Sequence, residues 1–332
     1  MRHLLFTLLL LCAVTAHAQT SSVINMGECQ LESGAKILDC RIAYTTVGTL
    51  NSDRSNAILF PTFYGGKASD LLKYVAPDLL VDSSKYFVIV VDSFGNGVSS
   101  SPSNSVSQSG AGFPAITIRD MVSMQKRLLN EHFKLPSLHA VVGISMGAMQ
   151  ALEWAVREPD IAKKFVAIAG SPRLAPFDIV FWETAERLLQ TVIDCKCQRP
   201  MAILNGMRFL LQGVDYQAAN APYESLAKIR ADIDKGSMTE PIAYDRMLQM
   251  RAMVTHDVSK DYGGDLSIAA KRVGKKLMVL AANKDNVVTP QPVLAFAKLG
   301  GAEALEFPTC GHDLPRCSAN LINPAVRDFL MR

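Results

Sequence analysis

The chain has 332 residues, of which 49% are hydrophobic and 20% are charged, a composition that suits a globular protein with one large core or a core and a lid. The formal net charge is +3, and the basic residues are scattered rather than gathered in a run. We therefore expect no nucleic-acid partner.

Residues 1–18 have the pattern of an export signal. A short basic start precedes an apolar run at residues 4–14, and Ala16-His17-Ala18 fits the small residues of a cleavage site. An uncleaved membrane anchor is the alternative, but the apolar run is short for a helix that spans a bilayer. We expect cleavage after Ala18 and an exported chain, periplasmic or secreted, with no later membrane association.

Cysteine usage agrees with export. One of the seven cysteines, Cys12, leaves with the signal, and an even number in an exported chain predicts disulfides. We expect two local disulfides, Cys29–Cys40 and Cys310–Cys317. The third pair, Cys195 with Cys197, is either bonded or consists of free buried thiols.

Strand-like and helix-like segments alternate along the remaining chain. Residues 29–48 predict an antiparallel hairpin at a sheet edge. Apolar, β-branched runs that suit buried parallel strands follow at residues 56–63, 86–94, 138–145, 163–170 and 275–283. This alternation predicts an α/β fold with a mostly parallel sheet.

Helical patterns and one long loop lie between these strands. Residues 117–133 have apolar residues at helical spacing, and Thr117 with Asp120 suggests a capping box at their start. Residues 146–159 form a second helical pattern. The segment Ser93–Gly112 is rich in serine and glycine and predicts a loop.

Residues 171–265 break the alternation because their pattern is mainly helical. We interpret them as a helical cap inserted before the strand that precedes Asp285, between core segments 19–170 and 266–332. The cap methionines either offer an adaptable apolar substrate surface or fill a helical core. They are Met201, Met207, Met238, Met247, Met250 and Met253.

Ser145 stands in a G-x-S-x-G pattern between a predicted strand and a predicted helix. That context is the one that a nucleophile elbow requires, whereas the pattern alone would also suit a small-residue turn. His312, in the loop after the last strand-like segment, is the candidate base, and Asp285, directly after a buried strand, is the candidate orienting acid. Asp313 and Asp257 are weaker candidates for the acid. The order Ser145, Asp285, His312 is that of an α/β-hydrolase.

An oxyanion hole needs two backbone N–H donors. Met146, the residue after the serine, is one candidate. Tyr64, in the loop after an early strand, is the other, with Phe63 next to it as the alternative donor and as a substrate contact. The aromatic residues Phe177, Phe181 and Trp182 either line the pocket or belong to the core.

Three segments carry a family resemblance. "GISMGAMQALEWA", "FPAITIRDMVSMQKRLL" and "GHDLP" resemble the homoserine O-acetyltransferases, a branch of the α/β-hydrolase superfamily, and the likeness covers Leu50–Gly170 and Lys276–Phe329. The resemblance implies that Ser145 takes up the acyl group, that Asp285 and His312 complete the triad, and that Asp313 contacts the acceptor.

Two enzymatic functions use this machinery. The first is an exported serine hydrolase acting on a small-molecule acyl ester, and the second is an O-acyltransferase with an alcohol acceptor such as homoserine. Export favours hydrolysis, as does the cap, which has "MRFLLQGVDY" where the resemblance leads us to expect an arginine-serine stretch. A non-catalytic binding module predicts a missing triad residue. No metal and no organic cofactor is expected, since no H-E-x-x-H motif and no phosphate loop in context occurs.

Overall fold

The computed structural model describes residues 19–196, 199–200, 202–211 and 214–332. The predicted signal at residues 1–18, together with Cys197 and Met201, lies outside the described residues.

An eight-stranded sheet forms the centre of the molecule, in the order β1-β2-β4-β3-β5-β6-β9-β10. The β1–β2 and β2–β4 pairs are antiparallel, and the remaining pairs are parallel, so the predicted mostly parallel sheet is confirmed. The strands are β1 (Thr20–Gln30), β2 (Lys36–Val47), β3 (Ala57–Pro61), β4 (Phe87–Val91), β5 (Leu138–Ile144), β6 (Ala162–Ile168), β9 (Leu277–Ala282) and β10 (Glu303–Phe307).

The predicted hairpin is longer than its sequence pattern suggested. β1 begins at Thr20 and forms the edge of the sheet. The disulfide Cys29–Cys40 joins the end of β1 to β2. The alternation of polar and apolar residues in β1 reflects a strand with one covered face, whereas the central strands are buried throughout.

Helices cover both faces of the sheet because alternate residues of the central strands point to opposite sides. In β3, Ala57 and Leu59 belong to one apolar cluster, and Ile58 and Phe60 belong to the other. The first cluster lies under α2, α3, α9 and α10, and the second lies under α1, α11 and α12. Their bounds are α1 (Ala68–Leu71), α2 (Ile118–Leu128), α3 (Met146–Arg157), α9 (Leu266–Val273), α10 (Gln291–Gly300), α11 (Leu314–Cys317) and α12 (Ala319–Met331).

The start of α2 shows the predicted capping box. The Thr117 side chain accepts from the Asp120 N–H at 3.1 Å, and the Asp120 carboxylate accepts from the Thr117 N–H at 2.8 Å. Asp120 Oδ1 also accepts from the N–H of Glu32, in the turn between β1 and β2, at 2.7 Å. This one carboxylate therefore starts a helix and fixes the hairpin against it.

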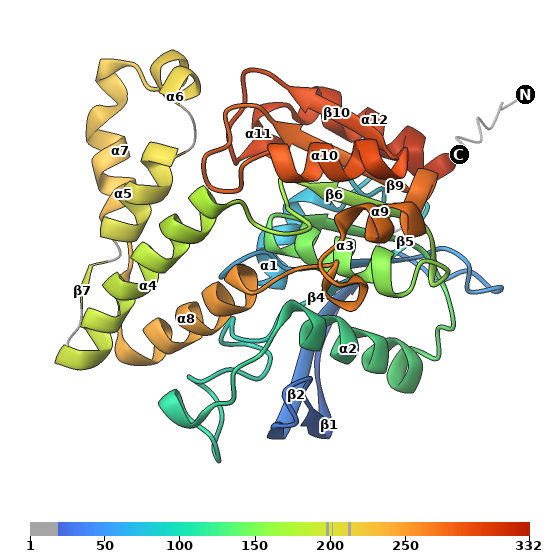
Figure 1. The fold of residues 1–332 in the computed structure, drawn as a ribbon, viewed down its shortest axis with the longest axis horizontal. Helices are drawn as coiled ribbons and strands as arrows, with labels where there is room; N and C mark the ends of the chain where they lie inside the picture. Colours follow the sequence, from blue (N-terminus) through green and yellow to red (C-terminus); the bar gives the residue numbers. More distant parts are fainter. Residues whose placement is uncertain (1–18, 197–198, 201, 212–213) are drawn as a thin grey trace, which may run out of the picture.

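A group of helices between β6 and β9 stands apart from the sheet (Figure 1). Figure 1 shows α4 and α8 side by side next to the core, with α5, α6 and α7 farther out. We refer to this group as the cap. It comprises α4 (Pro176–Cys195), β7 (Arg199–Pro200), α5 (Ala202–Leu211), α6 (Val214–Asn220), α7 (Leu226–Ile233), β8 (Ser237–Met238) and α8 (Glu240–Val254).

Most of the cap methionines that the structure describes are buried in an apolar cluster that the cap shares with the sheet and its helices. Met238, Met247, Met250 and Met253 are 3% exposed or less, so they are packed rather than presented to solvent. No helix in the described part of the chain is both long and apolar enough to cross a membrane.

Candidate active site

Ser145 occupies the tight turn between β5 and α3. Its φ of +55° and ψ of −121° lie in a region that is strained for any residue except glycine. Its N–H donates to Ile168 O at 2.9 Å, which fixes the turn to β6. A Cβ on Gly143 would lie 2.0 Å from Gly147 O, and a Cβ on Gly147 would lie 2.5 Å from Pro61 O. The turn therefore requires both glycines.

His312 links Ser145 to Asp285. His312 Nε2 lies 2.9 Å from Ser145 Oγ, and His312 Nδ1 lies 2.8 Å from Asp285 Oδ2. Asp285 Oδ1 accepts from the N–H groups of Val287 and Val288 at 2.9 and 3.0 Å. With the carboxylate fixed in this way, Nδ1 carries the proton and Nε2 is left to accept the serine proton.

The loop that carries His312 is closed by a covalent link. The predicted disulfide Cys310–Cys317 is present and encloses His312. Cys310 O accepts from the N–H of Lys284, next to the acid, at 3.2 Å. The base and the acid are thus held by loops that are bonded to one another.

The two weaker candidates for the acid have other partners. Asp257 pairs with Arg173 at 3.2 Å and accepts from the N–H of Ser259. Asp313 pairs with Arg316, one turn along α11. Asp285 is therefore the carboxylate that the fold brings to His312.

The expected oxyanion donors lie at the same edge of the sheet as Ser145. Met146 is the first residue of α3, so its N–H has no acceptor one helical turn earlier. Among the described residues, the N–H groups of Phe63 and Tyr64 make no hydrogen bond either. The Phe63 ring packs against the second apolar cluster, and the Tyr64 ring meets Trp182 edge to face with centroids 5.1 Å apart.

Three cap residues hold the cap to this edge, and the sequence analysis identified none of them. Gln249 accepts from the N–H of Gly65 at 2.7 Å and donates to Phe94 O at 2.8 Å. Arg246, one turn earlier, covers Gly65, where a Cβ would collide with its guanidinium. Asp178, in the first turn of α4, accepts from the N–H of Thr289 at 3.1 Å. These side chains sit in ordinary helical patterns, so no local signal distinguishes them from other cap residues.

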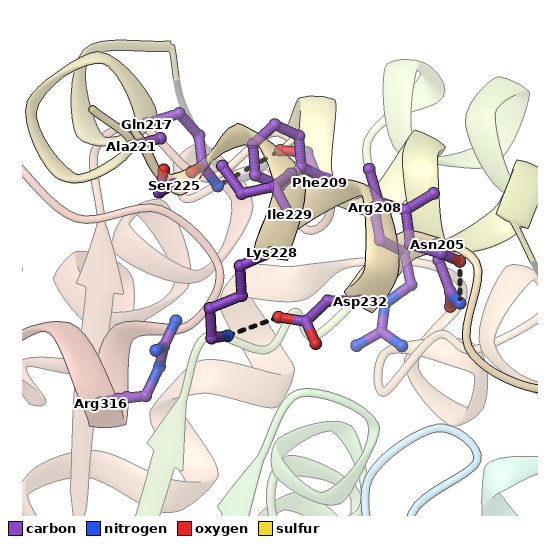
Figure 2. Close-up of a pocket in the computed structure, with 11 residues that line it drawn as sticks. Asn205, Arg208, Phe209, Gln217, Ala221, Ser225, Lys228, Ile229, Asp232 and Arg316 are labelled. Carbon is purple, nitrogen blue, oxygen red and sulfur yellow. Dashed lines mark hydrogen bonds and ion pairs between the residues drawn. The ribbon is translucent and has the colours of Figure 1, made fainter. Parts of the chain in front are cut away.

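Two cavities lie between the cap and the core. The larger, of about 550 Å³, opens between α5, α7 and α11. Figure 2 shows the side chains of Lys228, Asp232 and Arg208 on one side of this space and Arg316 on the other. Its volume falls in the range of small-molecule sites.

The smaller cavity has a volume of about 20 Å³ and lies under α4 and α8. Phe181 and Trp182 line it, as the sequence allowed, whereas Phe177 is 55% exposed and does not. Tyr64 forms the wall nearest the core, and Arg208 borders both cavities. Arg208 is therefore common to the walls of both cavities.

The arrangement suits acyl transfer through a serine. Oγ has a base within hydrogen-bond distance, the base has an orienting carboxylate, and a helix N-terminus stands beside the site where negative charge would develop. Ser145 is 7% exposed and the His312 side chain is 16% exposed, so bulk water reaches the site through a narrow opening.

Comparison with known proteins agrees with this geometry. Residues 58–315 match the family described as the alpha/beta hydrolase fold. The chain belongs to the α/β-hydrolase family. It is 36% identical to a probable esterase of Corynebacterium glutamicum, over 79% of this chain and 80% of that protein. It is 35% identical to an ethyl acetate hydrolase of Pseudomonas veronii, over 83% of this chain and 84% of that protein.

A solved structure and a third relative extend this comparison. The structure of an acetylester hydrolase from Corynebacterium glutamicum superposes with a TM-score of 0.84 at 29% identity and covers 94% of this chain and 96% of its own. A homoserine O-acetyltransferase of Methanococcoides burtonii is 33% identical over 71% of this chain but 49% of its own length. The resemblance to the acetyltransferase branch is thus confirmed, with esterases alongside it.

Proposed function

We propose that this protein is a serine esterase that hydrolyses small acyl esters through an acyl-Ser145 intermediate. The observation that carries the proposal is the continuous hydrogen-bonded chain from Asp285 through His312 to Ser145 at a strained elbow. Two of the proteins that align over most of their own length are named as hydrolases of acetate esters, which supports a short acyl group.

The reaction follows from the positions of these groups. Ser145 Oγ attacks the ester carbonyl carbon while His312 Nε2 takes its proton, and the oxyanion that forms accepts hydrogen bonds from the N–H of Met146 and of Tyr64 or Phe63. The carbonyl re-forms, the C–O bond to the alcohol breaks, and His312 returns the proton to the leaving alkoxide. Water, deprotonated by the same nitrogen, then releases the carboxylic acid.

An O-acyltransferase is the second candidate because acetyltransferases are among the relatives. The triad is common to both reactions, and the two differ in whether water or an alcohol takes the acyl group from Ser145. Hydrolysis is the better supported, since the acetyltransferase relative is matched over about half of its length while the esterases are matched over most of theirs.

Product partition separates the two functions. Purified protein would receive an activated acetyl ester with increasing homoserine, and mass spectrometry would identify the products, with Ser145→Ala as the control. We expect acetate whose formation is independent of homoserine and is lost in the variant, a decrease of about 10³-fold or more. Acetylhomoserine that rises with the acceptor would establish the transferase instead, and full activity of the variant would exclude both.

We also propose that the mature protein is exported. The sequence pattern of residues 1–18 supports this, and two disulfides are typical of an oxidising compartment. The full chain produced in a Gram-negative bacterium should be recovered from the periplasm or medium with Gln19 as its first residue. An intact N-terminus in the cytoplasmic fraction would contradict export.

A further inference from the structure

The smaller cavity beside Tyr64 has walls from both the core and the cap. It is enclosed chiefly by aromatic rings and by two guanidinium groups, and at about 20 Å³ it has room for roughly one water-sized group. The side chains used below are Tyr64 from the loop after β3, Trp182 from α4, Arg208 from α5 and Arg246 from α8.

Two buried polar atoms of this wall have no hydrogen-bond partner within the described residues. They are the hydroxyl of Tyr64 and Nε1 of Trp182, a residue that is 3% exposed. The indole nitrogen can only donate a hydrogen bond. Burial raises the pKa of the Tyr64 phenol to about 12, so the phenol keeps its proton at neutral pH and can donate as well. A buried donor without an acceptor destabilises the site, and an acceptor from a ligand would remove that cost.

The two guanidinium groups add positive charge without a matching acid. Arg246 lies over the Tyr64 ring at 5.2 Å from its centroid. Across the part of the chain that the structure describes, neither Arg246 nor Arg208 forms an ion pair or a hydrogen bond. Arginine stays charged in proteins and offers five donors, so these groups also call for an acceptor.

The nearest acids are engaged elsewhere. Asp245, beside Arg246 in α8, accepts from the N–H of Ser103 at 2.9 Å and makes no direct contact with the Arg246 guanidinium. Burial raises the pKa of Asp245, against the smaller opposite effect of the Arg246 charge. Asp313, whose charge acts on Arg208, is paired with Arg316. The cavity therefore presents donors and positive charge, with no carboxylate of the described chain to satisfy them.

The walls of the cavity are fixed to the elements that carry the triad. Tyr64 follows Pro61, whose carbonyl oxygen contacts the start of α3 directly after Ser145. The helix that carries Trp182 is held by Asp178 to Thr289, in the loop after Asp285. The cavity and the triad thus share supporting loops, and one residue of the cavity wall, Tyr64, is also the expected second oxyanion donor.

We propose that this donor-lined cavity receives one oxygen of a carboxylate on the substrate, so that the enzyme selects esters that carry a negative charge close to the ester group. Arg246 pairs with one carboxylate oxygen, and Trp182 Nε1 and the Tyr64 hydroxyl donate to it. Substrate enters from the larger cavity, where Figure 2 shows Arg208 among the lining side chains. This inference rests on the proposed esterase function and deepens it.

Matched esters test the proposal on both sides of the ester bond. Acetoxyacetate compared with acetoxyacetone, and monoethyl succinate compared with ethyl levulinate, replace a carboxylate by a methyl ketone of nearly equal shape. We expect kcat/KM for the carboxylate ester to exceed that for the ketone at least about tenfold in one of the two pairs. A tenfold ratio corresponds to the contribution of about one charge-assisted hydrogen bond. The pair that shows the preference identifies whether the charge is on the alcohol or the acyl side.

Three variants locate the effect. Arg246→Gln should reduce the preference to about one, and Trp182→Phe, which removes one donor but keeps a ring, should reduce it severalfold. Arg251→Gln is the matched control, because Arg251 is on the same helix but pairs with Glu186 outside the cavity. The ratio between two substrates is insensitive to a general loss of activity. No preference in either pair, or a preference that survives in Arg246→Gln, would overturn the proposal.

Binding without hydrolysis keeps this proposal separate from the esterase proposal. Calorimetry on Ser145→Ala should detect the preferred carboxylate ester, and binding should weaken at least about tenfold when Arg246→Gln is added. If the wild type hydrolyses esters without regard to charge, the carboxylate proposal alone fails. If the carboxylate binds but no ester is hydrolysed, the esterase proposal alone fails.

Discussion

Gln249 connects the cap to the loops that form the candidate oxyanion hole. Its side chain is completely buried, and it bonds to Gly65 N–H and to Phe94 O. The N–H groups of Phe63 and Tyr64 directly precede Gly65, so the position of these donors depends on a residue of α8. Gln249 acts through the loop backbone and does not itself contact the reacting atoms, which makes it a positioning residue.

Replacing Gln249 by methionine should therefore affect the transition state more than substrate binding. The oxyanion exists only after attack, so we expect kcat to fall about 10- to 100-fold with KM nearly unchanged. Gln249→Glu, which keeps the acceptor for Gly65 N–H, should retain more activity than Gln249→Met.

Steady-state kinetics on an activated acetyl ester measure both constants. Gln190→Met, at the surface of α4 where Gln190 bonds to Asp194, controls for the substitution itself and should leave both constants unchanged. A rise in KM with constant kcat in Gln249→Met would show that Gln249 serves substrate binding instead.

Among the elements, the loop of His312 combines a catalytic side chain with a covalent restraint. The disulfide Cys310–Cys317 brackets the base, and Cys310 Sγ also lies 3.0 Å from Ser318 Oγ, at the start of α12. Cutting this link frees the loop ends while leaving the hydrogen bond between His312 and Asp285 in place. The restraint acts on the position of the base rather than on its chemistry.

The double variant Cys310→Ser, Cys317→Ser should consequently lower kcat by about tenfold, because a base displaced by a fraction of an ångström transfers its proton less often. The Cys29→Ser, Cys40→Ser variant lacks a disulfide far from the triad and should keep kcat while losing stability by about 2–4 kcal/mol. Activity and urea unfolding measured on both variants separate the two effects. Equal kcat in both would show that the His312 loop needs no covalent restraint.

The elements that position the triad could be predicted from the sequence for a physical reason. β9 is apolar throughout and β5 is apolar except for His139, a composition typical of strands that are buried on both faces. The carboxyl ends of parallel strands lie at one edge of the sheet. Ser145 and Asp285 directly follow such strands, so their approach follows from the topology. The sequence also predicted the two local disulfides, since short separations favour pairing.

The docking of the cap could not be predicted in the same way. Arg246 and Gln249 lie in α8, where their spacing is that of any helix, and their partners are loops more than 150 residues earlier in the chain. Phe177 and Trp182 are both aromatic residues of α4, yet one is exposed and the other lines the cavity. Such differences depend on which face of a helix packs against the core, and no local sequence pattern specifies that face.

For the whole molecule, a buried polar network joins the hairpin, α2, α3 and the segment after the cap. Arg119 pairs with Glu153 at 2.8 Å, with Asp261 at 2.7 Å and with Glu32 at 3.4 Å. His256, which follows α8, lies 3.8 Å from the second oxygen of Glu153. Both Glu153 and His256 are almost completely buried, so their ionisation is coupled to the stability of the fold.

Burial shifts the two pKa values in opposite directions. It raises the pKa of Glu153 from 4.5 to about 7, against the attraction of Arg119, and lowers the pKa of His256 from 6.5 to about 3. The contribution of Glu153 is complete below pH 4.5 and is lost as the pH rises to about 7. The contribution of His256 is complete above pH 6.5 and is lost as the pH falls to about 3.

Glu153→Gln and His256→Gln should therefore change the pH dependence of the free energy of unfolding in opposite ways. Relative to the wild type, Glu153→Gln should gain stability steadily between pH 4.5 and about 7, because glutamine has no proton to lose in the buried site. His256→Gln should gain stability as the pH falls below 6.5, because no buried imidazole then has to be charged.

Urea unfolding at intervals across this range measures both differences directly. Curves that stay parallel to the wild type would mean that neither group titrates differently in the folded and unfolded chains, and the network would then be a packing feature without a role in the pH response.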